Sequence, residues 1–104
     1  MAKGTTLTVG ELEAALKDAR THAEDLLALV NTALPERTFV CRWAAALVRA
    51  LATGRFHAAR WKVILLRRAL ALRPDLAEIH GLLDAVASFL GPAPVAPLVR
   101  RGAR

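Results

Sequence analysis

Nine basic residues lie between Arg37 and Arg73, and no acidic residue stands among them. They are Arg37, Arg42, Arg49, Arg55, Arg60, Lys62, Arg67, Arg68 and Arg73. Arginine holds phosphate through two hydrogen bonds and stacks on flat rings. A solvated helix face normally mixes both signs of charge, because opposite charges four residues apart stabilise it. The run therefore predicts a surface for an anionic partner, and the alternative is pairing with acidic residues of this chain or of another subunit.

The spacing of these residues arranges them in stripes. Arg42 and Arg49 are seven residues apart, as are Arg60 and Arg67, so each pair lies on one side of a helix. Arg55, Lys62 and Arg73 form a further stripe. On the face away from the apolar seam of this helix, Trp61, with Leu65 and Leu72, could cover a neighbouring helix or dock another subunit, or the tryptophan could stack on a nucleic-acid base. The candidate nucleic-acid-binding residues are Arg42, Arg49, Arg55, Arg60, Lys62, Arg67, Arg68, Arg73 and Trp61.

Residues that could carry out catalysis are few and scattered. The histidines are His22, His57 and His80, and neither they nor Cys41 have the spacing of metal ligands. Ser88 has no base near it in sequence, and no glycine-rich phosphate loop is present. We therefore predict a non-catalytic protein with no metal site and no cofactor.

Acidic residues gather on both sides of the basic run. Glu11, Glu13, Asp18, Glu24 and Asp25 precede it, and Asp75, Glu78 and Asp84 follow it. The formal net charge of +6 thus combines a basic middle, two acidic flanks and a basic end. This separation favours contacts between unlike faces of neighbouring subunits, so we expect self-association as well as an anionic partner.

The sequence pattern predicts that four helices carry these residues. The first begins at Thr8, which forms a capping box with Glu11. Leu7 and Leu12 form the accompanying hydrophobic staple, and the helix ends near residues 31–33. Its apolar seam is Leu12, Leu16, Ala19, Ala23, Leu26 and Val30. The second runs from residues 35–36 to a C-terminal Gly54, with a buried stripe of Phe39/Val40, Trp43, Leu47 and Leu51.

The third helix spans residues 56–72 and the fourth runs from residues 74–75 to Gly91. Their seams are Phe56, Ala59, Val63, Leu66 and Leu70, and then Leu76, Ile79, Leu83, Val86 and Leu90. No segment resembles a strand. The sequence predicts an all-α protein: a compact antiparallel four-helix bundle over residues 8–91, a disordered lead at 1–7, and a Pro-rich, basic, disordered arm at 92–104.

Length and composition fit one small domain. The chain has 104 residues, of which 55% are apolar, and a single cysteine, which supports no disulfide framework. No signal peptide is evident at the N-terminus, and no apolar run approaches the roughly 18 residues of a membrane span. We expect a cytoplasmic protein. Association with a membrane is not expected, because the aromatic and leucine positions of the basic helices are needed in the core.

Part of the basic region resembles the second helix of a tetratricopeptide repeat. The matching residues are Gly54, Phe56, Ala59, Ala69, Leu70, Leu72 and Pro74. The interval from Ala59 to Ala69 is about three residues longer than the repeat pattern, and the sequence holds at most one such unit. The resemblance implies a protein-binding helical hairpin. Together with the basic charge, it gives the alternative function, a helical adaptor that binds an acidic protein partner through the third helix.

As a whole, the small Arg-rich and Ala-rich helical chain resembles the small subunits of CRISPR effector complexes, the ribonucleoproteins of antiviral defence. The resemblance implies a subunit that stacks in several copies beside other protein subunits and presents its basic face to RNA or DNA, with single strands favoured. Arg42, Arg49, Arg60 and Arg67 would then face the nucleic acid. Binding through phosphates would be largely independent of base sequence.

Overall fold

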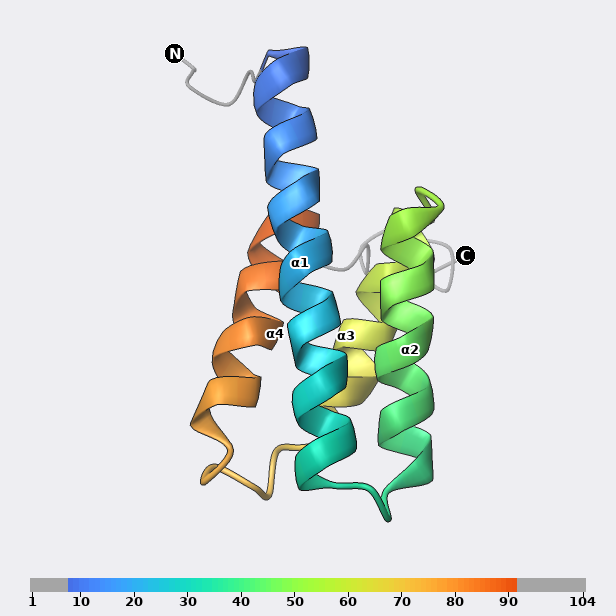
Figure 1. Cartoon of the computed structure of the whole chain (residues 1–104), viewed down its shortest axis with the longest axis vertical. Helices are drawn as coiled ribbons and strands as arrows, with labels where there is room; N and C mark the ends of the chain where they lie inside the picture. The colour runs from blue at the N-terminus through green and yellow to red at the C-terminus, as the bar shows by residue number, and fades with distance from the viewer. Residues whose placement is uncertain (1–7, 92–104) are drawn as a thin grey trace, which may run out of the picture.

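A computed structural model of the chain describes residues 8–91, which form four α-helices joined by short turns (Figure 1). The helices are α1 (Val9–Ala33), α2 (Thr38–Ala52), α3 (Phe56–Ala69) and α4 (Ala77–Leu90). No strand occurs in this part of the chain. The predicted all-α fold is confirmed, whereas the predicted lead and basic arm lie outside the described residues.

The four helices pack as an antiparallel bundle. Successive helices run in opposite directions, with α1 against α2 and α4, and α3 against α2 and α4 (Figure 1). Each helix contributes a leucine with no solvent exposure to the core: Leu26, Leu47, Leu66 and Leu83. The predicted seams of α3 and α4 therefore supply the core, because apolar residues three and four apart fall on one helix face.

Helix α1 is longer than its neighbours, and its first turns project beyond them (Figure 1). Its start is the predicted capping box: the Glu11 backbone N–H donates to Thr8 Oγ1 at 3.0 Å, and the Thr8 N–H donates to Glu11 Oε1 at 2.9 Å. The predicted seam is wrong at its beginning, because Leu12 is 52% exposed. No neighbouring helix reaches this turn, and full burial starts at Ala19. The predicted staple partner Leu7 lies outside the described residues.

The turn between α2 and α3 is closed by a Schellman motif. The Arg55 N–H donates to the Ala50 carbonyl at 2.8 Å, and the Gly54 N–H donates to the Leu51 carbonyl at 3.4 Å. Gly54 has φ +75°, a conformation that residues with a Cβ rarely adopt. The predicted role of Gly54 is confirmed, and the turn places Arg55 at the junction of the two basic helices.

Three predicted boundaries are wrong by a few residues. Helix α2 starts at Thr38, because the preceding residues form a turn in which the Arg37 N–H bonds the Leu34 carbonyl at 3.0 Å. Helix α3 ends at Ala69 and α4 starts at Ala77, because two more turns, with N–H donors from residues 73 and 76, separate them. The residue before each proline, Leu34 or Arg73, is disfavoured in helical geometry, and both residues lie outside the helices.

Two apolar side chains of the predicted helices are exposed. Leu72 lies beyond the end of α3 and is 90% exposed. Phe39 is 65% exposed, so Val40, which is buried, is the member of the predicted Phe39/Val40 pair that joins the core. Trp43 is half-buried and packs against the core, as predicted.

Candidate nucleic-acid interface

The predicted binding residues Arg60 and Arg67 lie on the flank of α3 that faces α4. Arg60 Nε donates to the Leu90 carbonyl at 2.9 Å, and Arg67 Nη2 donates to Asp84 Oδ1 at 2.8 Å. The Leu90 carbonyl is one of the last four of α4, which have no partner within the helix. Both arginines therefore join α3 to α4. For these two residues the structure shows pairing within the chain, which the sequence analysis left open as the alternative to an anionic partner.

Arg73 is also engaged within the chain. It lies in the connection after α3, where its Nε and Nη2 donate to the two carboxylate oxygens of Asp75 at 3.0 and 2.9 Å. The hydrogen bonds from Arg73 lower the pKa of Asp75, and the same pairing raises the pKa of Arg73. The predicted stripe of Arg55, Lys62 and Arg73 is thus interrupted, because α3 ends before Arg73.

The other basic residues of the run have no acidic partner within residues 8–91. In that range, ion pairs form at Arg67–Asp84 and Arg73–Asp75 alone. Helices α2 and α3 contain no acidic residue. The members of the predicted site with neither an ion pair nor a side-chain hydrogen bond in that range are Arg42, Arg49, Arg55, Lys62 and Arg68.

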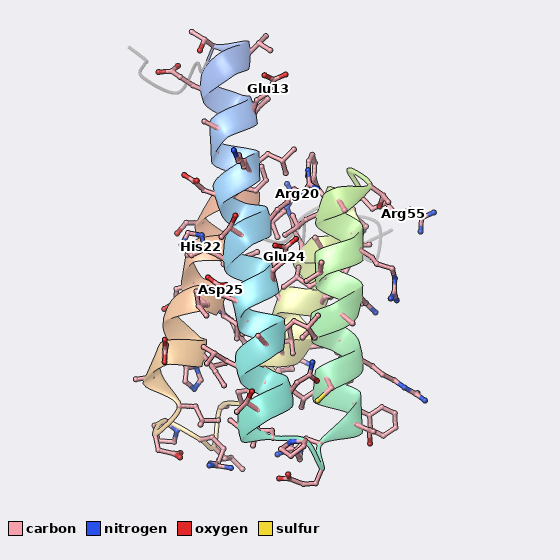
Figure 2. The ribbon with its side chains drawn as sticks, viewed as in Figure 1. Glu13, Arg20, His22, Glu24, Asp25 and Arg55 are labelled. Atoms are coloured by element: carbon pink, nitrogen blue, oxygen red, sulfur yellow. The ribbon has the colours of Figure 1, made fainter. Side chains whose placement is uncertain are left out.

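Three of these residues line a shallow groove between α2 and α3, which we call the α2–α3 groove. Its volume is about 510 Å³ and its lining is Ala46, Arg49, Ala50, Thr53, Arg55, Ala58 and Lys62. Four of the lining side chains are alanine or threonine, so the two helices leave a hollow that the longer basic side chains border. Figure 2 shows Arg55 extending outward from the turn between the helices.

The remaining two free members lie outside the lining of this groove. Arg42 is exposed on α2, and its Cζ lies 6.0 Å from the centroid of the Phe39 ring. That ring in turn lies 6.2 Å from the Trp43 ring. Arg68 is exposed on α3. The first turns of α2 therefore combine positive charge with aromatic surface.

Trp61 lies on the outer side of α3 and is 39% exposed. Its indole Nε1 donates to His57 Nε2 at 3.2 Å, and the two rings meet edge to face with centroids 6.3 Å apart. Trp61 is among the residues predicted from the sequence, whereas His57 and the small residues of the groove are not. The four-residue interval between His57 and Trp61, which puts both on one helix face, is the signal that could have found the histidine.

The acidic residues of α1 form no ion pair with the basic run within the described residues. Figure 2 shows Glu24 and Arg20 on the side of α1 towards α2, whereas His22 and Asp25 lie on the other side. His22 Nδ1 lies 2.6 Å from the Asp18 carbonyl, and His80 Nε2 lies 3.0 Å from the Arg73 carbonyl. Residues 8–91 contain no cluster of three side chains able to hold a metal ion.

Comparison with known proteins adds no relative. The chain matches no family model, and neither the curated proteins nor the solved structures yield a match. Within the described range, no helix has both the length and the apolar character needed to cross a membrane. The two resemblances in the sequence therefore stay predictions.

Proposed function

We propose that this protein is a non-catalytic assembly subunit that binds the phosphate backbone of a nucleic acid along the α2–α3 groove. The observation that carries the proposal is the lining of that groove, in which Arg49, Arg55 and Lys62 stand together without an acidic residue. Cations lining one groove add their potentials and raise the local concentration of a polyanion. The resemblance to CRISPR small subunits suggests several copies in an RNA-guided complex in the cytoplasm.

The hydrogen bonds within the bundle narrow the set of binding residues. Arg60, Arg67 and Arg73 already donate to the Leu90 carbonyl, Asp84 and Asp75, so binding a phosphate would require them to give up these bonds. Arg42 and Arg68 are exposed and can extend the binding surface of the groove. Groove side chains that reach phosphates carry no information on base sequence, so the proposed binding is largely sequence-independent.

The experiment is a salt series of fluorescence anisotropy with labelled single-stranded RNA and DNA and with duplex DNA. The test variant is Arg49→Gln with Lys62→Gln. For single strands, the slope of log affinity against log salt becomes shallower by about 0.7 for each phosphate that the protein no longer neutralises. We expect the slope of the double variant to be shallower by roughly 1.4 if each residue neutralises one phosphate.

The matched control is Lys17→Gln with Arg20→Gln. Both residues are exposed on α1, and their replacement changes the net charge by the same amount. We expect this control to keep nearly the full salt slope. Equal losses of affinity in the two double variants would show that net charge, and not the groove, drives binding, and no binding by the wild-type protein at low salt would refute the proposal.

A second candidate is the tetratricopeptide-like adaptor that binds an acidic protein. The observation that favours it is Phe39, which is 65% exposed and lies beside Arg42. Aromatic residues and arginine dominate the energetics of protein interfaces. A specific acidic protein that binds the wild type and the Arg49→Gln/Lys62→Gln variant, but not Phe39→Ala, would favour this function.

A further inference from the structure

The outer face of α3 carries an aromatic side chain that the bundle covers only in part. Helix α3 packs against α2 and α4, and its seam of Ala59, Val63 and Leu66 is buried. Trp61 lies away from this seam and retains 39% exposure. Trp61 therefore does not serve to cover a neighbouring helix, which was one of the three roles that the sequence left open.

His57 fixes the orientation of the exposed indole. It lies one turn before Trp61 and accepts the indole N–H at 3.2 Å, with the two rings at 81°. An exposed tryptophan usually has its N–H available for a partner. Here that donor is already used, so the ring offers a new ligand its flat faces. Such a surface recognises by stacking, which tolerates any base because every base has a π-face.

This ring stands next to the α2–α3 groove. Ala58 lines the groove, and Trp61 follows it by three residues, so the two are neighbours on the helix surface. Trp61 itself is outside the lining of the groove, one helical turn from Ala58. The methyl group of Ala58 puts little bulk between the cations and the indole. A chain of phosphates in the groove would thus run beside an oriented aromatic ring.

We infer that the α2–α3 groove and Trp61 together form a site for single-stranded nucleic acid, in which an unpaired base stacks on the indole held by His57. This inference rests on the proposed function and adds the class of ligand. A duplex presents the same phosphates, but its bases are paired and stacked inside the helix. Stacking on Trp61 therefore separates single strands from duplexes, whereas the groove cations alone do not.

The experiment uses the full chain with the Trp43→Phe substitution, which leaves Trp61 as the sole tryptophan. Its fluorescence is followed during titration with oligo(U), oligo(dT) and a duplex of equal length, and affinities are measured by anisotropy at one salt concentration. We expect the single strands to quench Trp61 at saturation and the duplex to leave it nearly unchanged.

Substitutions at the aromatic pair give the second readout, in the chain that retains Trp43. Trp61→Ala should weaken single-strand binding on the order of 5- to 100-fold and leave duplex binding and the salt slope unchanged. Trp61→Phe keeps a flat ring and should retain most of the affinity. His57→Ala should give an intermediate loss, because the indole remains but is no longer oriented. Leu72→Ala, which removes an exposed aliphatic side chain beyond the end of α3, is the control and should have no effect.

The outcomes separate the two proposals. If Trp61→Ala binds single strands as the wild type does, while Arg49→Gln/Lys62→Gln weakens binding, the stacking inference is wrong and the groove remains. If single strands bind without quenching Trp61, the stacking inference is also wrong. If the wild type binds no nucleic acid at low salt, both proposals fail. Circular dichroism and thermal unfolding of each variant distinguish weaker binding by a folded protein from unfolding.

Discussion

Replacing Arg60 by methionine tests whether this residue belongs to the bundle or to the binding surface. Methionine keeps an unbranched apolar side chain and removes the guanidinium, so the change mainly removes the hydrogen bond from Nε to the Leu90 carbonyl. A hydrogen bond with one charged partner contributes roughly 1.5–3 kcal/mol when buried. Arg60 is half-buried and the freed carbonyl can bind water, so we expect the free energy of unfolding to fall by about 1–2 kcal/mol.

Urea unfolding followed by far-ultraviolet circular dichroism measures this change, and a thermal scan should show Tm falling by about 4–8 °C for each kcal/mol. Arg68→Met is the control, because Arg68 is exposed on the same helix and makes no side-chain hydrogen bond within the described residues. Its stability should stay within about 0.5 kcal/mol of wild type. If Arg60→Met is as stable as the wild type and loses nucleic-acid affinity, the assignment of Arg60 to the α3–α4 contact is wrong.

Three further changes test the fold and its pH dependence. Gly54→Ala should cost about 1–2 kcal/mol, because φ +75° strains any residue with a Cβ although nothing lies within 4 Å of the added methyl group; an unchanged Tm would contradict this. Leu83→Ala removes a side chain with no exposure and should cost about 2–5 kcal/mol in urea unfolding; a change near zero would place Leu83 outside the core. Arg73 holds the pKa of Asp75 below its ordinary 3.8, so their pairing stabilises the folded state above that pH and is lost as the pH falls through the lowered pKa. Asp75→Asn should therefore be slightly less stable than wild type at neutral pH and equal to it in strong acid, as thermal melts across pH would show; a difference that persists in acid would have another cause.

Local signals in the sequence predicted most of the fold. The capping box at Thr8 and the glycine at position 54 were placed correctly, because both depend on hydrogen bonds within a few residues of the chain. The buried residues of α3 and α4 followed from their spacing. The helix starts near Pro35 and Pro74 were placed too early, because the sequence does not show whether a proline begins a helix or belongs to the turn before it.

The extent of burial along α1 depended on its neighbours. The pattern of apolar residues from Leu12 to Val30 is regular, yet only its later part is covered. A helix seam shows which face is apolar, but the lengths of the neighbouring helices determine how far that face is buried. The same limit applies to Phe39, whose exposure depends on where α3 passes and not on its own residue type.

For the candidate site, charge and spacing can be read along the chain, and they were enough to predict a run of arginines without acidic residues on two adjacent helices. The sequence could not show which of these arginines bond within the bundle and which remain available to a partner. Arg60 and Arg67 have the same residue type and regular spacing as Arg42 and Arg49, but only the packing of α4 beside α3 brings the Leu90 carbonyl and Asp84 within hydrogen-bond distance. Likewise, only the packing of α2 against α3 brings Arg49, Arg55 and Lys62 to one groove. Arg60 and Arg67 bond to atoms 30 and 17 residues away in sequence, and the tertiary structure alone sets those distances.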